Sequence, residues 1–444
     1  MGFINLLYKK FQYDRHLTYS KNEIEKLQKN KLIKLVKYAY KNSKLYKQLF
    51  KSKGLTYEEL EDIDIKDLPK TNKNLLMDNF NDLITVDNIN KKDVINFIDD
   101  HQDPTKLLND KYYVIHSSGT TGEIGYYIYT KNNWELLKAV GASRLFDSFG
   151  IQRKSYVFIG AVDGHYAGIS FFLSPVNKFE EYFYKDFLLL DINTPLNYYI
   201  DKLNSLQPNV ISGYPSAMKM LIEYQEIGQL EISPETVICG GEPLSKKIVE
   251  KIKKHWNTTP KNYYGTSESI LMGIGDGNQQ IYIFDDLIQL EIVEDGILLT
   301  NLYNYTEPLI RYKIDDLLVK PDKQVNKYPF TTVESVSGRQ EDLLWLRNEK
   351  GKDDFIHPIV FVEFHVKGLK KIQVIKKSEV NIHIKAVKTE DSTSSQLKHR
   401  INRKLSSILK KKNMENINFS IKLVDRIKND PQSGKYRIIK RKSD

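Results

Sequence analysis

Regular alternation of strand-like and helix-like segments is the feature that most constrains the fold of this chain, and it runs from residue 111 to about 300. The strand candidates are residues 112–116, 126–130, 156–161, 209–212, 236–240 and 260–264. The helix candidates are residues 132–149, 168–173, 195–206, 215–228 and 244–256. Alternation at this spacing predicts a layered α/β domain with a largely parallel sheet. Ligands of such sheets bind at the carboxyl ends of the strands.

The segments on either side of this alternation have different patterns. Apolar residues at helical spacing dominate the first 100 residues or so, which predicts a helical cap on the main domain. Apolar runs at 281–284 and 287–292 predict antiparallel strands, and Glu294-Asp295-Gly296 predicts a hairpin turn. These segments complete one large domain over residues 1–337.

A second pattern begins after Gly338, where the chain predicts a unit of mixed helices and strands. Its expected elements are a helix at 357–364, strands near 371–376, 380–387 and 418–424, and a basic helix near 395–411. The predicted fold class is therefore α/β, with a large layered N-terminal domain and a small, mobile α+β C-terminal domain over residues 338–444.

Composition excludes several classes of protein. No apolar run approaches the roughly 18–20 residues of a membrane helix, and the N-terminus has no signal-peptide pattern. The single cysteine, Cys239, cannot form an internal disulfide, which fits a cytoplasmic protein. The formal charge of +10 comes from dispersed lysines and indicates a solvated surface rather than a nucleic-acid groove, since no nucleic-acid motif accompanies it. The sequence is also compatible with a homodimer.

A polar loop, Ser117-Ser118-Gly119-Thr120-Thr121-Gly122, lies between the strand candidates 112–116 and 126–130. Its glycines allow positive φ angles, and its hydroxyl and N–H groups suit an anion such as a nucleotide phosphate. An ordinary hairpin turn explains the same composition equally well.

Five further loops carry residue types that suit nucleotide chemistry, although each alone is better explained as an ordinary turn, linker or tail. They are residues 239–245, 262–268, 309–316, 338–342 and 431–437. In the second of them, Tyr264 suits stacking on a base, Thr266 suits a phosphate contact and Glu268 suits Mg²⁺, which prefers carboxylate and phosphate oxygens.

Taken together, in this order and spacing, the loops resemble those of the adenylate-forming superfamily of acyl-CoA synthetases and peptide-synthetase adenylation domains. The resemblance extends from about residue 110 to the end of the chain. The Gly-Glu-Pro loop at 241–243 and the segment Gly213–Ser216 are most similar to the phenylacetate–CoA ligase branch. Within that branch, the chain looks most like the shorter relatives from capsule and polysaccharide gene clusters.

The resemblance implies an ATP site built from these loops. Its triphosphate would be held by Ser117, Ser118, Gly119, Thr120, Thr121 and Gly122. Its adenine would be lined by Gly241, Glu242 and Pro243, with Tyr264 stacking on the ring beside Gly265. The ribose hydroxyls would bind Asp316, with Asp315 as the neighbouring alternative.

The resemblance also implies the catalytic residues. Thr266 would face the α-phosphate, Arg339 would reach the ribose or a phosphate, and Lys435 would enter the site during adenylation. Glu268 would bind Mg²⁺, and Glu341 would lie at the hinge about which the small domain rotates. Positive charge from the metal and the lysine suits a reaction in which a carboxylate attacks a phosphate, since both reactants are negative.

The implied activity is ATP-dependent conversion of a carboxylic acid to an acyl-adenylate, with release of pyrophosphate and transfer to a thiol, most plausibly that of CoA. The expected acid pocket contains His165, Tyr166, Gly213, Tyr214 and Cys239, which suits an aromatic or small acid. Residues 347–354 replace the glycine-rich turn by which larger members shape their thiol tunnel, which leaves room for a carrier protein, an amine or a sugar as acceptor in surface-polysaccharide or natural-product synthesis. A non-catalytic nucleotide-binding protein is the third alternative.

Overall fold

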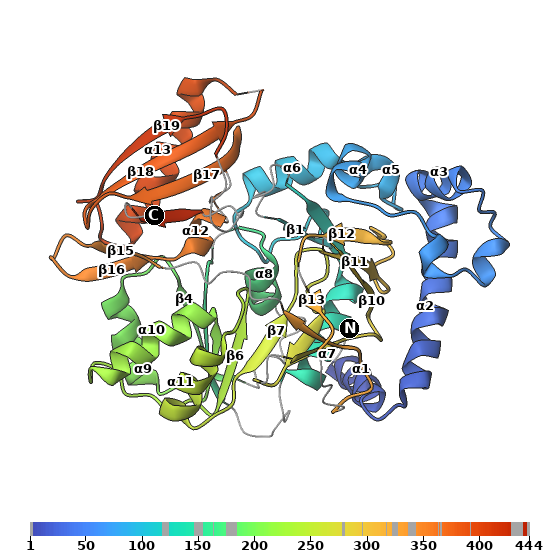
Figure 1. Ribbon diagram of the computed structural model, residues 1–444, viewed down its shortest axis with the longest axis horizontal. Helices are drawn as coiled ribbons and strands as arrows, with labels where there is room; N and C mark the ends of the chain where they lie inside the picture. The colour runs from blue at the N-terminus through green and yellow to red at the C-terminus, as the bar shows by residue number, and fades with distance from the viewer. Residues whose placement is uncertain are drawn as a thin grey trace.

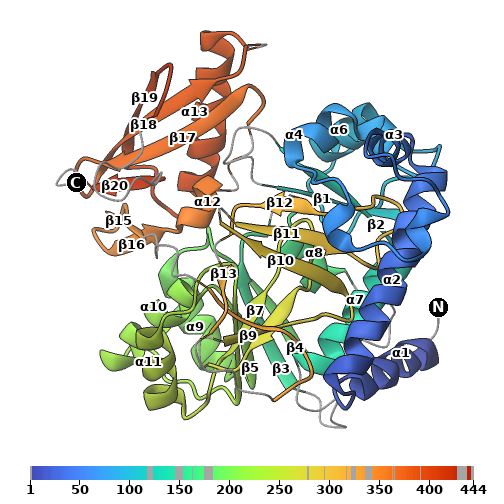
Figure 2. The same cartoon turned by 45° about the vertical axis from the view of Figure 1, so that its right-hand side comes forward.

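The computed structural model shows a large α/β domain with helices at its N-terminal side and a smaller domain packed on one end (Figures 1 and 2). The residues that the structure describes are 3–117, 124–145, 154–162, 164–174, 184–277, 280–294, 296–316, 318–321, 327–335, 343–362, 364, 366–390, 392–427 and 438–441. The predicted boundary between the domains, at residues 337 and 338, lies outside them.

Helices and strands follow one another along the chain much as the sequence predicts. The helices are α1 (Phe3–His16), α2 (Lys21–Asn42), α3 (Lys44–Ser52), α4 (Lys73–Asp78), α5 (Phe80–Leu83), α6 (Lys91–Asp100), α7 (Lys131–Arg144), α8 (Ala167–Leu173), α9 (Leu196–Leu206), α10 (Pro215–Glu226), α11 (Lys246–Trp256), α12 (Pro358–Val362) and α13 (Ser394–Lys411), with short 3-10 turns η1 (Glu59–Glu61) and η2 (Ile65–Asp67). The strands are β1 (Tyr112–His116), β2 (Tyr126–Thr130), β3 (Lys154–Gly160), β4 (Tyr184–Asp191), β5 (Val210–Gly213), β6 (Thr236–Gly240), β7 (Lys261–Tyr264), β8 (Gly273–Gly275), β9 (Gln280–Ile283), β10 (Ile288–Val293), β11 (Gly296–Asn301), β12 (Tyr312–Ile314), β13 (Leu318–Val319), β14 (Thr332–Ser335), β15 (Leu344–Arg347), β16 (Asp353–Ile356), β17 (Leu369–Lys376), β18 (Asn381–Lys388), β19 (Asn418–Leu423) and β20 (Ile439–Arg441).

The central sheet of the large domain has nine strands in the order β13-β14-β9-β8-β7-β6-β5-β3-β4. Its strands from β4 to β7 pair in parallel, which confirms the predicted α/β layering. The other half is antiparallel, so the prediction of a largely parallel sheet is wrong for that half. The connection from β7 to β8, residues 265–272, is too short for the crossover of a dozen or more residues that parallel strands need.

Two smaller sheets accompany the central one. β1 and β2 form a two-stranded antiparallel sheet, and β10, β11 and β12 form a three-stranded antiparallel sheet. The predicted hairpin turn is confirmed, because Val293 and Gly296 are cross-strand partners in the β10–β11 pair. The sequence reasoning omitted β4, which forms the outer edge of the parallel half.

The predicted helical cap is present, since α1 to α6 precede β1 and contribute to the same hydrophobic core as the sheets. A buried ion cluster anchors it. Asp286, fully buried after β9, accepts hydrogen bonds from His16 Nδ1 at 2.7 Å and from the Arg144 guanidinium. Burial alone would raise the pKa of Asp286, but Arg144 and His16 outweigh it and hold the pKa well below its usual range.

The small domain, residues 343–441, contains the sheet β19-β18-β17-β20 with α13 against it, which confirms the predicted α+β pattern. The predicted helix over 357–364 is shorter and spans Pro358–Val362. Buried apolar residues of β15, β16 and α12 share one core cluster with those of the large domain around α9, α10 and α11, and Figure 1 shows these elements stacked.

Removal of the buried negative charge should destabilise the fold strongly. We predict that Asp286→Asn lowers the free energy of unfolding by about 3–5 kcal/mol, because it leaves buried positive charge uncompensated. Urea unfolding at neutral pH measures this. Asp62→Asn is the matched control, because Asp62 forms an exposed pair with Lys29 and should change stability little.

The lowered pKa also fixes the pH dependence of this contribution. The ionised Asp286 stabilises the fold above the ordinary aspartate pKa of about 3.9 and loses this effect as the pH falls below it. The difference in stability between the wild type and Asp286→Asn should therefore shrink in acid, and a pH-independent difference would contradict the assignment.

Candidate active site

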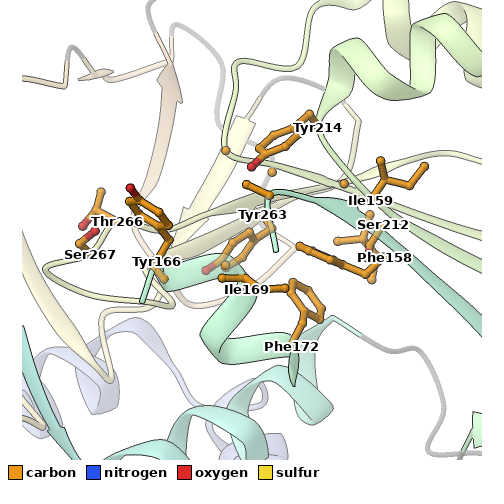
Figure 3. Close-up of a pocket in the computed structure, with 18 residues that line it drawn as sticks. Phe158, Ile159, Tyr166, Ile169, Phe172, Ser212, Tyr214, Tyr263, Thr266 and Ser267 are labelled. Atoms are coloured by element: carbon orange, nitrogen blue, oxygen red, sulfur yellow. The ribbon is translucent and has the colours of Figure 1, made fainter. Parts of the chain in front are cut away.

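A cavity of about 260 Å³ lies where the parallel strands β3, β5, β6 and β7 end and α8 begins (Figure 3). Its aromatic lining consists of Phe158, Tyr166, Phe172, Tyr214 and Tyr263. Among the described residues, those that line the cavity include no Asp, Glu, Lys, Arg or His. The cavity is therefore uncharged and suits a flat apolar group.

The residues predicted from the sequence that line this cavity are Tyr166, Gly213, Tyr214, Gly241, Gly265 and Thr266. Two of these positions combine a positive φ with a close neighbour, and both therefore require glycine. At Gly213, where φ is +155°, an added Cβ would lie 2.5 Å from the Ile159 carbonyl oxygen. At Gly241, where φ is +76°, it would lie 2.9 Å from Cε1 of the Tyr214 ring.

Two predicted pocket residues lie outside the cavity lining. His165 is buried with its Nε2 3.0 Å from the His101 carbonyl oxygen, and burial lowers its pKa. Cys239 is fully buried at the end of β6, and burial raises the pKa of its thiol. Neither side chain is therefore placed to react with a bound acid, and Cys239 is not an activated nucleophile.

The expected adenine and ribose residues lie beside each other. The Tyr264 hydroxyl, at the end of β7, donates to Asp316 Oδ2 at 2.8 Å. Asp316 follows β12 in another sheet, so this bond joins two loops that are 52 positions apart in sequence. Together the two side chains offer a ring and a carboxylate to a nucleoside, as the resemblance implies.

Glu268 is buried at the meeting point of three sheets. Its Oε1 accepts hydrogen bonds from the hydroxyls of Tyr127, at 2.7 Å, and Tyr312, at 3.4 Å. The two hydroxyls are 3.0 Å apart. Burial and then the charge of Glu268 raise the pKa of Tyr127, and likewise of Tyr312, so both phenols remain proton donors.

The donor set suits Mg²⁺ only if a ligand supplies most of the oxygens. Among the described residues, no group of three or more His, Cys, Asp and Glu side chains could hold a metal ion. No donor in the described part of the chain bonds to Glu268 Oε2, which leaves that oxygen for a cation. Mg²⁺ binds through one or two carboxylates plus substrate phosphates, so Glu268 with a nucleotide fits it.

Only the first residue of the expected triphosphate loop is described. Ser117 Oγ accepts a hydrogen bond from the Gly125 N–H at 2.8 Å, and Lys73 Nζ lies 3.4 Å from it. The other predicted site residues of this loop and of the chain beyond residue 337 lie outside the described residues. They are Ser118, Gly119, Thr120, Thr121, Gly122, Arg339, Glu341 and Lys435.

Thr266 and Glu242 both have defined partners. Thr266, on the cavity wall, accepts at Oγ1 from the Ser269 N–H at 3.3 Å. Glu242 accepts at Oε2 from the Ser216 N–H at 3.1 Å, and its Oε1 lies 3.1 Å from His357 Nε2. Pro243 follows it, partly buried and outside the cavity lining.

Sequence reasoning did not identify several residues of this region. Tyr127 lies in the predicted strand 126–130 and Tyr312 in the predicted loop 309–316, each without a predicted role, and Lys73 also has no predicted role. Glu307 was also omitted: it is fully buried, its Oε2 accepts from the Ile128 N–H at 2.7 Å, and burial raises its pKa well above the usual range. In the sequence, Glu307 is marked by the proline that follows it at position 308, after a polar turn, and this pattern does not indicate a buried carboxyl group.

Family comparison matches both parts of the chain. Residues 18–282 match the model of the AMP-binding enzyme family, and residues 350–442 match the CapK C-terminal domain. The chain belongs to the AMP-binding, adenylate-forming enzymes. It is 24% identical to Protein CapK of Staphylococcus aureus over 440 residues, which covers 94% of this chain and 89% of that protein.

A second relative and a solved structure are also similar to this adenylate-forming enzyme. It is 25% identical to phenylacetate-coenzyme A ligase of Escherichia coli (strain K12), over 74% of each chain. The crystal structure of 2-hydroxyisobutyryl-CoA ligase in complex with 2-HIB-AMP and CoA matches with a TM-score of 0.58 at 16% identity, over 96% of this chain and 92% of that one. This last similarity shows the shared fold. In the part of the chain that the structure describes, no helix has the length and apolarity to cross a membrane.

The Tyr264–Asp316 pair gives a test of the nucleoside site. We predict that Tyr264→Phe, which keeps the ring, raises the KM for ATP by a few-fold, because one hydrogen bond is lost. Tyr264→Leu, which also removes the stacking surface, should raise it at least tenfold, since stacking of a base on an aromatic ring is worth about 1–3 kcal/mol. Steady-state kinetics measures both, and equal values for the wild type and Tyr264→Leu would remove Tyr264 from the adenine site.

Proposed function

We propose that this enzyme activates a small aromatic carboxylic acid with ATP and transfers the acyl group from the adenylate to CoA. The observation that carries the proposal is the uncharged, aromatic cavity next to Gly241 and Thr266. Its volume of about 260 Å³ is below the roughly 300–1,000 Å³ of sites for drug-sized ligands, which favours an acid with a single ring.

The lack of acid or base groups among the described lining residues suits this chemistry. The carboxyl group of the substrate is ionised at neutral pH, so its oxygen can attack the α-phosphorus without a general base. The P–O bond to pyrophosphate breaks as the new P–O bond forms. Positioning and charge neutralisation then supply most of the acceleration.

Each residue has a proposed part in this step. Tyr264 and Gly241 hold the adenine, Asp316 holds the ribose and Thr266 faces the α-phosphate. Mg²⁺ bound by Glu268 would offset the phosphate charge. In the second step the CoA thiol attacks the acyl carbonyl carbon and AMP leaves. We propose a cytoplasmic location, since the proposed reaction consumes ATP and CoA.

Another acceptor is the second candidate, and it has specific support. Asn348 Oδ1 accepts from the N–H groups of Lys350 and Lys352, both at 3.0 Å, in a tight charged turn between β15 and β16. This turn stands where larger members have a glycine-rich segment that shapes the thiol tunnel. The resemblance of the sequence to relatives from capsule and polysaccharide gene clusters favours surface-polysaccharide synthesis, with an amine, a sugar or a carrier protein as acceptor. The similarity to Protein CapK extends over 94% of the chain.

The test is ATP–pyrophosphate exchange with a panel of carboxylic acids, followed by addition of CoA. We expect exchange with arylacetic or benzoic acids and CoA-dependent release of AMP. Exchange without CoA-dependent turnover would favour the second acceptor class. Absence of exchange with every acid would overturn the adenylation proposal.

Lys435 supplies a direct test of the catalytic assignment. We predict that Lys435→Ala lowers the exchange rate about 10²–10³-fold, by analogy with the loss of one transition-state donor. The KM for the acid should change little, because the lysine acts on charge that develops in the reaction. Lys440→Ala, on β20 of the same domain, is the control and should retain the wild-type rate.

Gly168 gives a test of the cavity as the acid site. It lines the cavity near the start of α8, and an added Cβ there meets no atom within 4 Å. We predict that Gly168→Leu keeps the fold, since a glycine leaves the helix, and raises the KM for an aromatic acid at least tenfold. The KM for ATP should not change, and an unchanged KM for the acid would place the acid elsewhere.

A further inference from the structure

His357 of the small domain is fully buried against the large domain. It follows β16 and precedes α12. Its ring contacts Tyr214 and Ser216, where the chain passes from β5 into α10, and Glu242, in the loop between β6 and α11. A small-domain side chain therefore reaches the same loops that border the proposed active site.

The polar contacts of His357 connect it to the predicted adenine loop. Its Nε2 lies 2.7 Å from Ser216 Oγ and 3.1 Å from Glu242 Oε1. A carboxylate only accepts hydrogen bonds, so the bond to Glu242 requires a proton on Nε2. Burial alone would raise the pKa of Glu242, but His357 and Ser216 outweigh it and lower the pKa, which keeps the carboxylate ionised.

The ring of His357 also stacks on Tyr214, whose ring lines the cavity. Its centroid lies 4.6 Å from that of Tyr214, with 24° between the ring planes. Tyr214 lines the cavity and packs so closely on Gly241 that a Cβ there would lie 2.9 Å from the Tyr214 ring. Movement of His357 would therefore shift Tyr214 in the wall of the cavity. It would also shift Glu242 in the predicted adenine loop.

A second buried contact holds the two domains together without reaching the cavity. Lys412 Nζ, fully buried, donates to the carbonyl oxygens of Ile192, at 3.3 Å, and Thr194, at 2.9 Å. It also lies 3.4 Å from Asp354 Oδ1, and Asp354 Oδ2 accepts from the Leu196 N–H at 3.1 Å. This contact provides an internal comparison for His357.

We propose that His357 is a positioning residue, through which the docked small domain fixes the shared wall of the acid cavity and the adenine loop. The proposal rests on the acid-activating function proposed above. Its hydrogen bond to Glu242 sets the affinity for ATP, and its stacking on Tyr214 sets the affinity for the acid. The Lys412 contact, which only docks the small domain, sets neither the affinity for ATP nor the affinity for the acid.

The test separates the two contacts with two variants. His357→Ala should raise the Kd for ATP about 10- to 100-fold, the range expected for losing a hydrogen bond to a charged group. It should raise the KM for the acid about 5- to 10-fold, which is within the range for losing a stacked ring pair. His357→Gln keeps an N–H donor for Glu242 but loses the ring, so it should restore the Kd for ATP to within about threefold while the KM for the acid stays raised. Calorimetric titration with ATP and pyrophosphate-exchange kinetics provide these values.

The double variant Lys412→Met/Asp354→Asn is the matched control, because it removes both charges of the other interface contact. It should lower the melting temperature without changing either constant more than about threefold. Equal effects of the control and His357→Ala, or wild-type constants in a folded His357→Ala, would overturn the proposal. If His357→Ala does not fold, the test rests on His357→Gln. Equal changes in its Kd for ATP and its KM for the acid would contradict the proposal.

Failure of the proposed function gives a different result. In that case no acid supports exchange by the wild type, whereas ATP titration of the wild type, His357→Ala and His357→Gln still shows whether the bond to Glu242 controls nucleotide affinity. Unchanged ATP affinity in both variants would reject the role of His357 whatever the acid.

Discussion

The carboxylate of Glu268 accepts hydrogen bonds from two phenols and so connects three sheets of the large domain. Tyr127 comes from the β1–β2 pair, Tyr312 from the three-stranded sheet, and Glu268 itself from the loop after β7 of the central sheet. A buried carboxyl group needs hydrogen-bond partners, and the two phenols reach Glu268 only when all three sheets are in place. The position of the proposed metal ligand therefore depends on the assembly of the whole large domain.

Sequence reasoning identified the α/β layering, the helical cap and the small domain because each has a local periodicity. It also selected Tyr264 and Asp316, which bond to each other, from two separate loops. It did not foresee the antiparallel half of the central sheet, since strand direction depends on connection length more than on composition. The bond between Glu242 and His357 could not be predicted, because it joins residues of different domains that no pattern relates.

The buried ion pairs that stabilise the fold and the cavity proposed to bind the substrate are in different parts of the molecule. Buried charged groups with a structural role, such as Asp286 and Lys412, lie outside the described cavity lining and have opposite charges beside them. The described lining of the cavity is uncharged, so an ionised substrate meets no competing counter-charge there. The substrate carboxylate therefore interacts with the positive charge proposed near the nucleotide, from Mg²⁺ and Lys435.

One hydrophobic core runs through the interface of the two domains, from the helices beside the parallel strands into β15, β16 and α12. Separation of the small domain would expose part of this core to water and would carry a positive change in heat capacity. Hydrophobic association of this kind weakens on cooling as well as on strong heating. The fraction of molecules with the small domain docked therefore passes through a maximum with temperature. The rate of any step of turnover that needs the docked arrangement depends on this fraction, so its temperature dependence is curved as well.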